Sequence, residues 1–232
     1  NRSGDVRHRR ADGSAAAAWA PPPGRAWVLL PSGRRLDLLA PTPFDWTDDG
    51  LALGLARTTR WGGHSRWPLP LSVAQHSLGV LALRRRDGAA LSADQARREL
   101  LHDAEEGLLG FDCIAPLKPF LGERFAELER RLRAAVSARY GLPAWTTGAW
   151  RAHKAADLEM AAAEAVHVAG WSPGEVRTAL GLRAEAWAAD RLAETHGEEP
   201  WCPWPAETAA GRFLAALRGL SGMAAGGRAN LP

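Results

Sequence analysis

The chain carries an unusual stretch at residues 100–109: Leu100-Leu101-His102-Asp103-Ala104-Glu105-Glu106-Gly107-Leu108-Leu109. Its leucines predict an apolar helix that contributes to the core. Polar groups are rare in such a helix, because burying them without partners costs kilocalories per mole. On a helix His102 and Asp103 point about 100° apart, yet both reach a cation beside it, and Glu106 lies on the same face one turn after His102. Taken alone, the His-Asp pair is a weak signal, and a solvated or satisfied structural pair is the commoner explanation.

Helical patterns surround this stretch. Apolar residues recur at helical spacing around His76, from Phe120 to Val136, over about residues 148–169, and around Phe213. The same pattern places His76 in a buried helix face. Several helices begin at residues suited to capping, which are Thr47, Ser72, Ser92 and Ser172. We therefore expect an all-α domain.

The predicted domain covers residues 25–220. Near its start, two short apolar runs flank the turn residues Pro31-Ser32-Gly33, which predicts a short N-terminal β-hairpin over residues 27–39. Residues 1–24 are polar, Ala-rich and end in prolines, so we expect a disordered leader. Residues 221–232 are expected to be a flexible tail.

Composition narrows the classes of function. Hydrophobic residues make up 46% and charged residues 24%, which is ordinary for a globular protein. The net charge is +3, but the arginines lie in scattered clusters near acids, which favours solvated faces over a stable nucleic-acid partner. Cys113 and Cys202 form no C-x-x-C pair, which argues against a thiolate zinc site and suits a reducing cytoplasm. No apolar run reaches the ~18 residues that a membrane span needs, so we expect a cytoplasmic protein.

Three further segments strengthen the interpretation of the His-Asp pair as part of a functional site. They are Val73-Ala74-Gln75-His76-Ser77, the loop from Gly110-Phe111-Asp112 through Pro116-Leu117-Lys118, and Lys154-Ala155-Ala156-Asp157. In this order the motifs resemble the HD-domain phosphohydrolases, and most closely their bacterial and phage 5′-deoxynucleotidase-like branch. The resemblance covers roughly residues 25–220. The sequence departs from the pattern at Phe111, an extra residue between Gly110 and Asp112.

The resemblance implies a compact HD-domain helical bundle and a divalent metal ion held by His76, His102, Asp103 and Asp157. Imidazole and carboxylate ligands without thiolate suit Mn²⁺, Co²⁺, Fe²⁺, Ni²⁺, Zn²⁺ or Mg²⁺. The resemblance also assigns the handling of protons to Glu106, for which a partner that orients His102 is the alternative. Asp112 is a further catalytic candidate from its place in the loop motif.

Phosphate requires fixed positive charge, for which Arg60 and Lys118 are the candidates. In the resembling enzymes an Arg-Trp pair before the first metal histidine binds phosphate and lines the nucleoside pocket. The sequence has two such pairs, Arg60-Trp61 and Arg66-Trp67. The spacing from Arg60-Trp61 to His76 is closer to that of the resembling enzymes. For either tryptophan, core packing is the competing explanation in a chain with 11 of them.

The expected function is metal-dependent hydrolysis of a small nucleotide, a (deoxy)ribonucleoside 5′-monophosphate, to nucleoside and phosphate. A deoxynucleoside triphosphate hydrolase would use the same metal site. A catalytically silent nucleotide-binding module is another alternative, although Glu106 beside a full ligand set argues against it. A phosphodiesterase would need more basic surface or extra histidine ligands. The resemblance also implies a homodimer. We expect His64, His153 and His167 to be structural or exposed.

Overall fold

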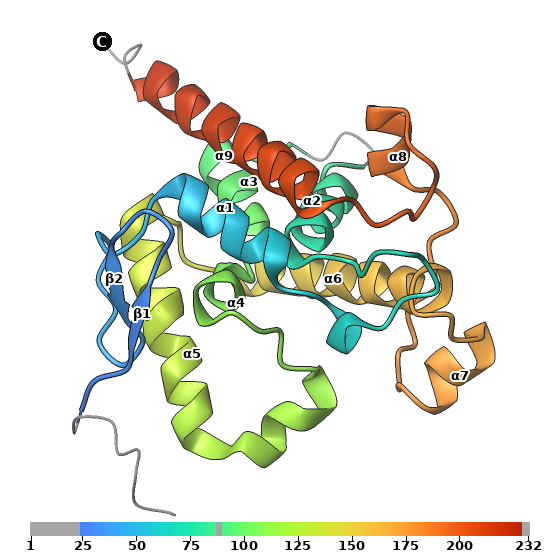
Figure 1. Ribbon diagram of the computed structural model, residues 1–232. Helices are drawn as coiled ribbons and strands as arrows, with labels where there is room; N and C mark the ends of the chain where they lie inside the picture. The colour runs from blue at the N-terminus through green and yellow to red at the C-terminus, as the bar shows by residue number, and fades with distance from the viewer. Residues whose placement is uncertain (1–23, 87–89, 229–232) are drawn as a thin grey trace, which may run out of the picture.

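Side-chain caps begin several helices of the computed structural model, which describes residues 24–86 and 90–228 (Figure 1). The hydroxyl of Thr47 accepts a hydrogen bond from the backbone at the start of α1 (Asp48–Arg57), and Ser72 does the same for α2 (Val73–Arg84). Ser92 and Gln95 form a reciprocal capping box at α3 (Ala93–Leu100). These contacts satisfy N–H groups that a helix start leaves without partners, and they confirm the predicted helix starts.

The remaining elements confirm a mostly helical fold with an N-terminal β-hairpin. Strands β1 (Trp27–Leu29) and β2 (Arg35–Asp37) pair antiparallel, with Val28 opposite Leu36. After α3 the helices are α4 (Ala104–Leu109), α5 (Lys118–Tyr140), α6 (Thr147–His167), α7 (Pro173–Thr178), α8 (Arg191–His196) and α9 (Ala206–Arg228). The short helix α8 was not predicted. Its cap is Asp190, whose side chain accepts from the backbone N–H groups of Leu192 and Ala193.

The main core lies where α1 packs against α9 and α4 (Figure 1). Leu51, Leu55 and Phe213 are fully buried there. Two glycines allow α1 and α4 to approach closely, because a Cβ at Gly54 would lie 2.3 Å from the backbone oxygen of Gly107. This close contact fixes α4, and with it Glu106, against the rest of the bundle.

The predicted continuous helix around His102 and Asp103 is wrong. Helix α3 ends at Leu100 and α4 begins at Ala104, while Leu101 (φ −99°, ψ 16°) and Asp103 (φ −112°, ψ 23°) leave the helical conformation. The break has a tertiary cause, since α3 packs against α9 and α2 whereas α4 packs against α1 and α5. Leu100, Leu101 and Leu108 stay buried on both sides of the break, so the apolar pattern continues through it.

Helices α2 and α6 form the second packing unit. Gly79 allows them to approach, because a Cβ there would lie 2.4 Å from Cε of Met160. In Figure 1, α6 runs across the centre of the molecule, and α7 lies beyond its C-terminal end. The arrangement sets one face of α6 opposite the buried face of α2, where His76 lies.

The ends of the chain differ in part from the prediction. Helix α9 continues to Arg228, past residue 220, where the domain was expected to end. The predicted leader covers residues 1–24, of which residues 1–23 lie outside the described residues, as do residues 229–232 of the predicted tail. Within residues 24–86 and 90–228, the helices lack the combination of length and apolarity needed to cross a membrane.

Candidate functional site

Four side chains converge between α2, α4 and α6. His76 comes from α2, His102 and Asp103 from the turn between α3 and α4, and Asp157 from α6. The ligating atoms of His76, His102 and Asp103 all lie within 4.8 Å of one another, so this group could hold a metal ion. Asp157 approaches from the opposite helix, with Oδ1 3.4 Å from Nε2 of His76. The structure therefore brings together all four predicted ligands.

Both histidines direct Nε2 toward the group of four predicted ligands. Nδ1 of His76 lies 2.6 Å from Oε1 of Glu164, and Nδ1 of His102 lies 2.9 Å from the backbone oxygen of Glu99. An imidazole that donates from Nδ1 keeps Nε2 available as a ligand. Both Nε2 atoms are buried and have no hydrogen-bond partner among the described residues. Buried polar atoms are seldom left unpaired, and a cation would satisfy both nitrogens.

The spacing of the facing atoms also fits a small divalent cation. Oδ2 of Asp103 lies 3.1 Å from Nε2 of His102 and 3.6 Å from Nε2 of His76. Ligands at right angles on an ion with bonds of about 2.1 Å are separated by about 3.0 Å. The side chains present therefore fit an ion that binds nitrogen and oxygen.

Opposite charges hold this group in its ionised form. Burial raises the pKa of Asp103 and of Asp157, but His102 and His76 outweigh it and keep both pKa values well below the usual range. Burial and the charge of Arg60 lower the pKa of His76, yet Glu164 and Asp157 raise it to about 9. Because acidic neighbours raise the pKa of both His76 and His102, a metal ion bound by their Nε2 atoms would compete with protons.

Glu106 lies beside this group in the first turn of α4. Its side chain is buried, and its Oε2 atom has no hydrogen-bond partner in the described part of the chain. Nζ of Lys118 lies 4.0 Å from Oε1. Burial, Asp103 and Asp112 raise the pKa of Glu106 to about 10. A carboxyl group with a raised pKa and an unpartnered oxygen is suited to accept or release a proton.

Arg60 and Trp61 reach the site from the segment before α2. The backbone N–H of Arg60 donates to the oxygen of Leu71, which ties this segment to the start of α2. Nε of Arg60 donates to Glu164 at 3.0 Å, and its NH1 atom lies 3.5 Å from Oδ2 of Asp112. The indole N–H of Trp61 donates to the same Glu164 oxygen at 3.2 Å.

Asp112 and Lys118 lie at the two ends of the loop between α4 and α5. Asp112 is turned toward Arg60, so the extra residue Phe111 does not carry it away from the site. Lys118 opens α5, two residues before the predicted helix start at Phe120. Its ammonium group donates to Glu129 at 2.9 Å and is farther from Glu106, so it lies at the margin of the site.

Two acids that hold the histidines were missed by the sequence analysis. Glu164 is buried, and its only sequence signal is that it is a single acid within Ala161-Ala162-Ala163-Glu164-Ala165. Glu99 accepts from His102 through its backbone and from Nδ1 of His153 through its side chain, at 2.8 Å. His153 is thus a buried structural residue, as predicted.

Comparisons with known proteins give one informative match. No protein-family model matches the sequence. The chain is 44% identical over 158 residues to a protein of Rhodobacter capsulatus, and the match covers 68% of this chain and 80% of that protein. The relative is described only as an uncharacterized protein, so the similarity shows kinship without assigning an activity.

Proposed function

We propose that this chain, which belongs to the same family as the Rhodobacter capsulatus protein, hydrolyses a phosphate ester of a small nucleotide with a divalent metal ion. The proposed substrate is a (deoxy)ribonucleoside 5′-monophosphate, and the products are the nucleoside and inorganic phosphate. The observation that carries the proposal is the pair of buried Nε2 atoms of His76 and His102. They have no hydrogen bond within the described residues and face the carboxylates of Asp103 and Asp157. The free cysteines Cys113 and Cys202 support a reducing, cytoplasmic setting.

The ligand set supports a borderline or hard cation. His76, His102, Asp103 and Asp157 would hold it, and their nitrogen and oxygen donors suit Mn²⁺, Co²⁺, Fe²⁺, Ni²⁺, Zn²⁺ or Mg²⁺. Such an ion, when bound, lowers the pKa of water and offsets negative charge on a phosphoryl group. The backbone of Glu99 and the side chain of Glu164 keep both imidazoles in the tautomer that binds metal.

Glu106 is the residue that handles the proton. Its unpartnered Oε2 atom is the position at which a proton from the attacking water is held. Burial in α4 keeps this carboxyl group away from bulk solvent. The positive charge of Arg60 lowers the pKa of Glu106 and so favours the ionised form needed to accept the proton. Lys118 lies 4.0 Å from Oε1.

Arg60 and Lys118 bind the phosphate group, and Trp61 lines the nucleoside pocket. Because Nε of Arg60 is already bonded to Glu164, a phosphate oxygen would bind at the terminal NH groups, one of which also faces Asp112. Asp112 lies 3.5 Å from NH1 and limits how the guanidinium can turn. This arrangement supports a small anionic substrate rather than a polymer.

Phosphate release from a panel of nucleotides tests the proposal. Nucleoside monophosphates, triphosphates and a short oligonucleotide are incubated with the purified protein and each of Mn²⁺, Co²⁺, Ni²⁺, Zn²⁺ and Mg²⁺. We expect release from monophosphates and no cleavage of the oligonucleotide, with His102→Ala as the inactive control. Preferred release of triphosphate would favour the triphosphate hydrolase. Comparable cleavage of oligonucleotides, or full activity of His102→Ala, would contradict the proposal.

A further inference from the structure

Glu164 is shared by three groups of the site. Its carboxylate is 1% exposed and belongs to α6, two turns after Asp157. Oε1 lies 2.6 Å from Nδ1 of His76, and Oε2 accepts from Nε of Arg60 at 3.0 Å and from the indole of Trp61 at 3.2 Å. One buried side chain thus contacts a predicted metal ligand and both residues of the predicted substrate pair.

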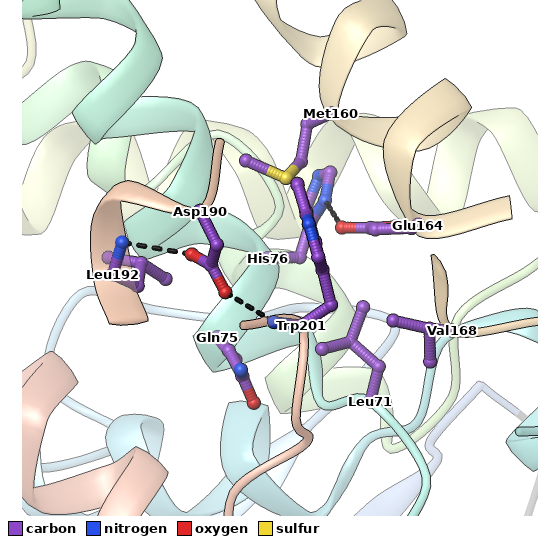
Figure 2. A pocket seen from close by; sticks show the side chains of 9 residues that line it. All are labelled: Leu71, Gln75, His76, Met160, Glu164, Val168, Asp190, Leu192 and Trp201. Carbon is purple, nitrogen blue, oxygen red and sulfur yellow. Dashed lines mark hydrogen bonds and ion pairs between the residues drawn. The ribbon is translucent and has the colours of Figure 1, made fainter. Parts of the chain in front are cut away.

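This carboxylate is buried, and apolar side chains lie on one side of it. Figure 2 shows the His76–Glu164 pair beside a cavity whose lining includes Leu71, Met160 and Trp201. The cavity measures about 20 Å³, room for about one water molecule. Hydrogen bonds in such a setting are stronger than in water, and solvent cannot readily replace them. The positions of His76 and Arg60 therefore depend on Glu164 itself.

Trp61 gives a second reason why Glu164 is needed. Its backbone has φ 58°, a left-handed conformation that a bulky residue rarely adopts. Gly62 follows with φ 63°, so the chain turns sharply just after Arg60. A strained conformation of this kind persists only where the surrounding contacts hold it, and the indole bond to Glu164 is one such contact.

We propose that Glu164 is a positioning residue that couples the metal-binding histidine His76 to the phosphate-binding Arg60. The proposal rests on the proposed function for the identity of these two roles. By accepting from Nδ1, Glu164 directs Nε2 of His76 toward Asp103 and Asp157. By accepting from Nε, it sets the plane of the Arg60 guanidinium. A change at Glu164 should therefore weaken the binding of metal and of phosphate together.

The variant Glu164→Gln tests this coupling. Glutamine keeps the size of the side chain but removes its negative charge and leaves one acceptor oxygen, so it weakens the contacts with both His76 and Arg60. The control is Glu159→Gln on the same helix, whose carboxylate pairs with Arg86 at 2.6 Å. Co²⁺ affinity and the inorganic phosphate affinity of the Co²⁺-loaded protein are measured by calorimetric titration. We expect Glu164→Gln to weaken Co²⁺ binding about 10- to 100-fold and phosphate binding as well, with Glu159→Gln unchanged.

A double mutant separates positioning from a general loss of structure. In an Arg60→Ala background, Glu164→Gln should have no further effect on phosphate affinity but should still weaken Co²⁺ binding. A further loss of phosphate affinity of the same size in that background would overturn the coupling through Arg60. Wild-type affinities in Glu164→Gln would overturn the proposal altogether.

A second variant replaces the first one in the test if the first one misfolds. If Glu164→Gln does not melt cooperatively, Glu164→Asp is measured in the same way, because its shorter carboxylate cannot reach Nδ1 of His76 and Nε of Arg60 together. Loss of both affinities supports the coupling, and wild-type values contradict it. These titrations need no turnover. A wild-type protein that releases no phosphate from any nucleotide would sink the proposed function while leaving this test intact.

Discussion

Two neighbouring glutamates should respond in opposite ways to the same substitution. Glu106 has an unpartnered oxygen beside the candidate metal site, whereas Glu105 is 1% exposed and accepts from Nε of Arg133 at 2.6 Å. We predict that Glu106→Gln loses turnover and keeps stability, and that Glu105→Gln loses stability and keeps turnover. Because glutamine matches glutamate in size, neither change leaves a cavity.

The structure sets the size of each effect. Burial raises the pKa of Glu105 to about 7 despite Arg133, so part of the population is already neutral at pH 7. Arg133 is half exposed and can regain water, so we expect a loss of about 1–2 kcal/mol. For a chain of this length that corresponds to a fall in Tm of about 2–8 °C.

For Glu106 we expect a small effect on stability and a large effect on turnover. Burial and acidic neighbours raise its pKa to about 10, so in the metal-free protein it is neutral at pH 7 and glutamine resembles it closely. We expect its Tm to change by less than about 2 °C. Losing a positioned acid or base should lower kcat by a factor of about 10² to 10⁴.

Calorimetric melting of the metal-free proteins and phosphate release at saturating metal, on the same preparations, measure both properties. Metal content, determined in parallel, should equal that of the wild type in both variants. If Glu106→Gln retains wild-type kcat, or if Glu105→Gln loses as much turnover as Glu106→Gln, the assigned role of Glu106 is wrong. If Glu106→Gln loses its metal, Glu106 is a ligand.

Two further predictions concern the candidate site, and a third concerns Asp37 in the N-terminal hairpin. The variants His102→Ala and Asp157→Ala should lose bound metal, turnover and the metal-dependent rise in stability together. That rise is about 2.7 kcal/mol when free metal is 100-fold above Kd, and metal analysis and thermal melting measure the losses. Arg60→Ala and Lys118→Ala should keep the metal but lose about 10- to 100-fold in kcat/KM, and unchanged kinetics in both would show that phosphate binds elsewhere. Burial raises the pKa of Asp37, but two backbone N–H donors outweigh burial and hold this pKa below its value in the unfolded chain. The contribution of Asp37 to stability is therefore complete above the unfolded pKa and is lost as the pH falls through the folded pKa. Asp37→Asn should therefore show a flatter acid-unfolding curve, and a curve as steep as that of the wild type would contradict this.

The local features of the fold could be predicted from the sequence because they depend on neighbouring residues. The cap at Ser72 and the capping box of Ser92 with Gln95 act within one helical turn. The hairpin of β1 and β2 forms around a five-residue connection marked by Pro31 and Gly33. The predicted ligands were found in a similar way, because His102 and Asp103 are polar residues within an apolar stretch and Asp157 lies in a recognisable motif.

The tertiary structure alone decided how these residues meet. The chain breaks between Leu100 and Ala104 because α3 and α4 pack against different helices, and a periodic apolar pattern does not record such a change of direction. The same holds for Glu164, which is an isolated acid in an alanine-rich helix until α2 and the Arg60 segment pack against it. Glu164 lies 88 positions after His76 and 104 positions after Arg60 in the sequence. Local spacing carries no sign of contacts between residues so far apart. The ordered motifs and the family resemblance that they carry therefore predicted which side chains could bind a metal, and the packing of α2, α4 and α6 determined that they face one another.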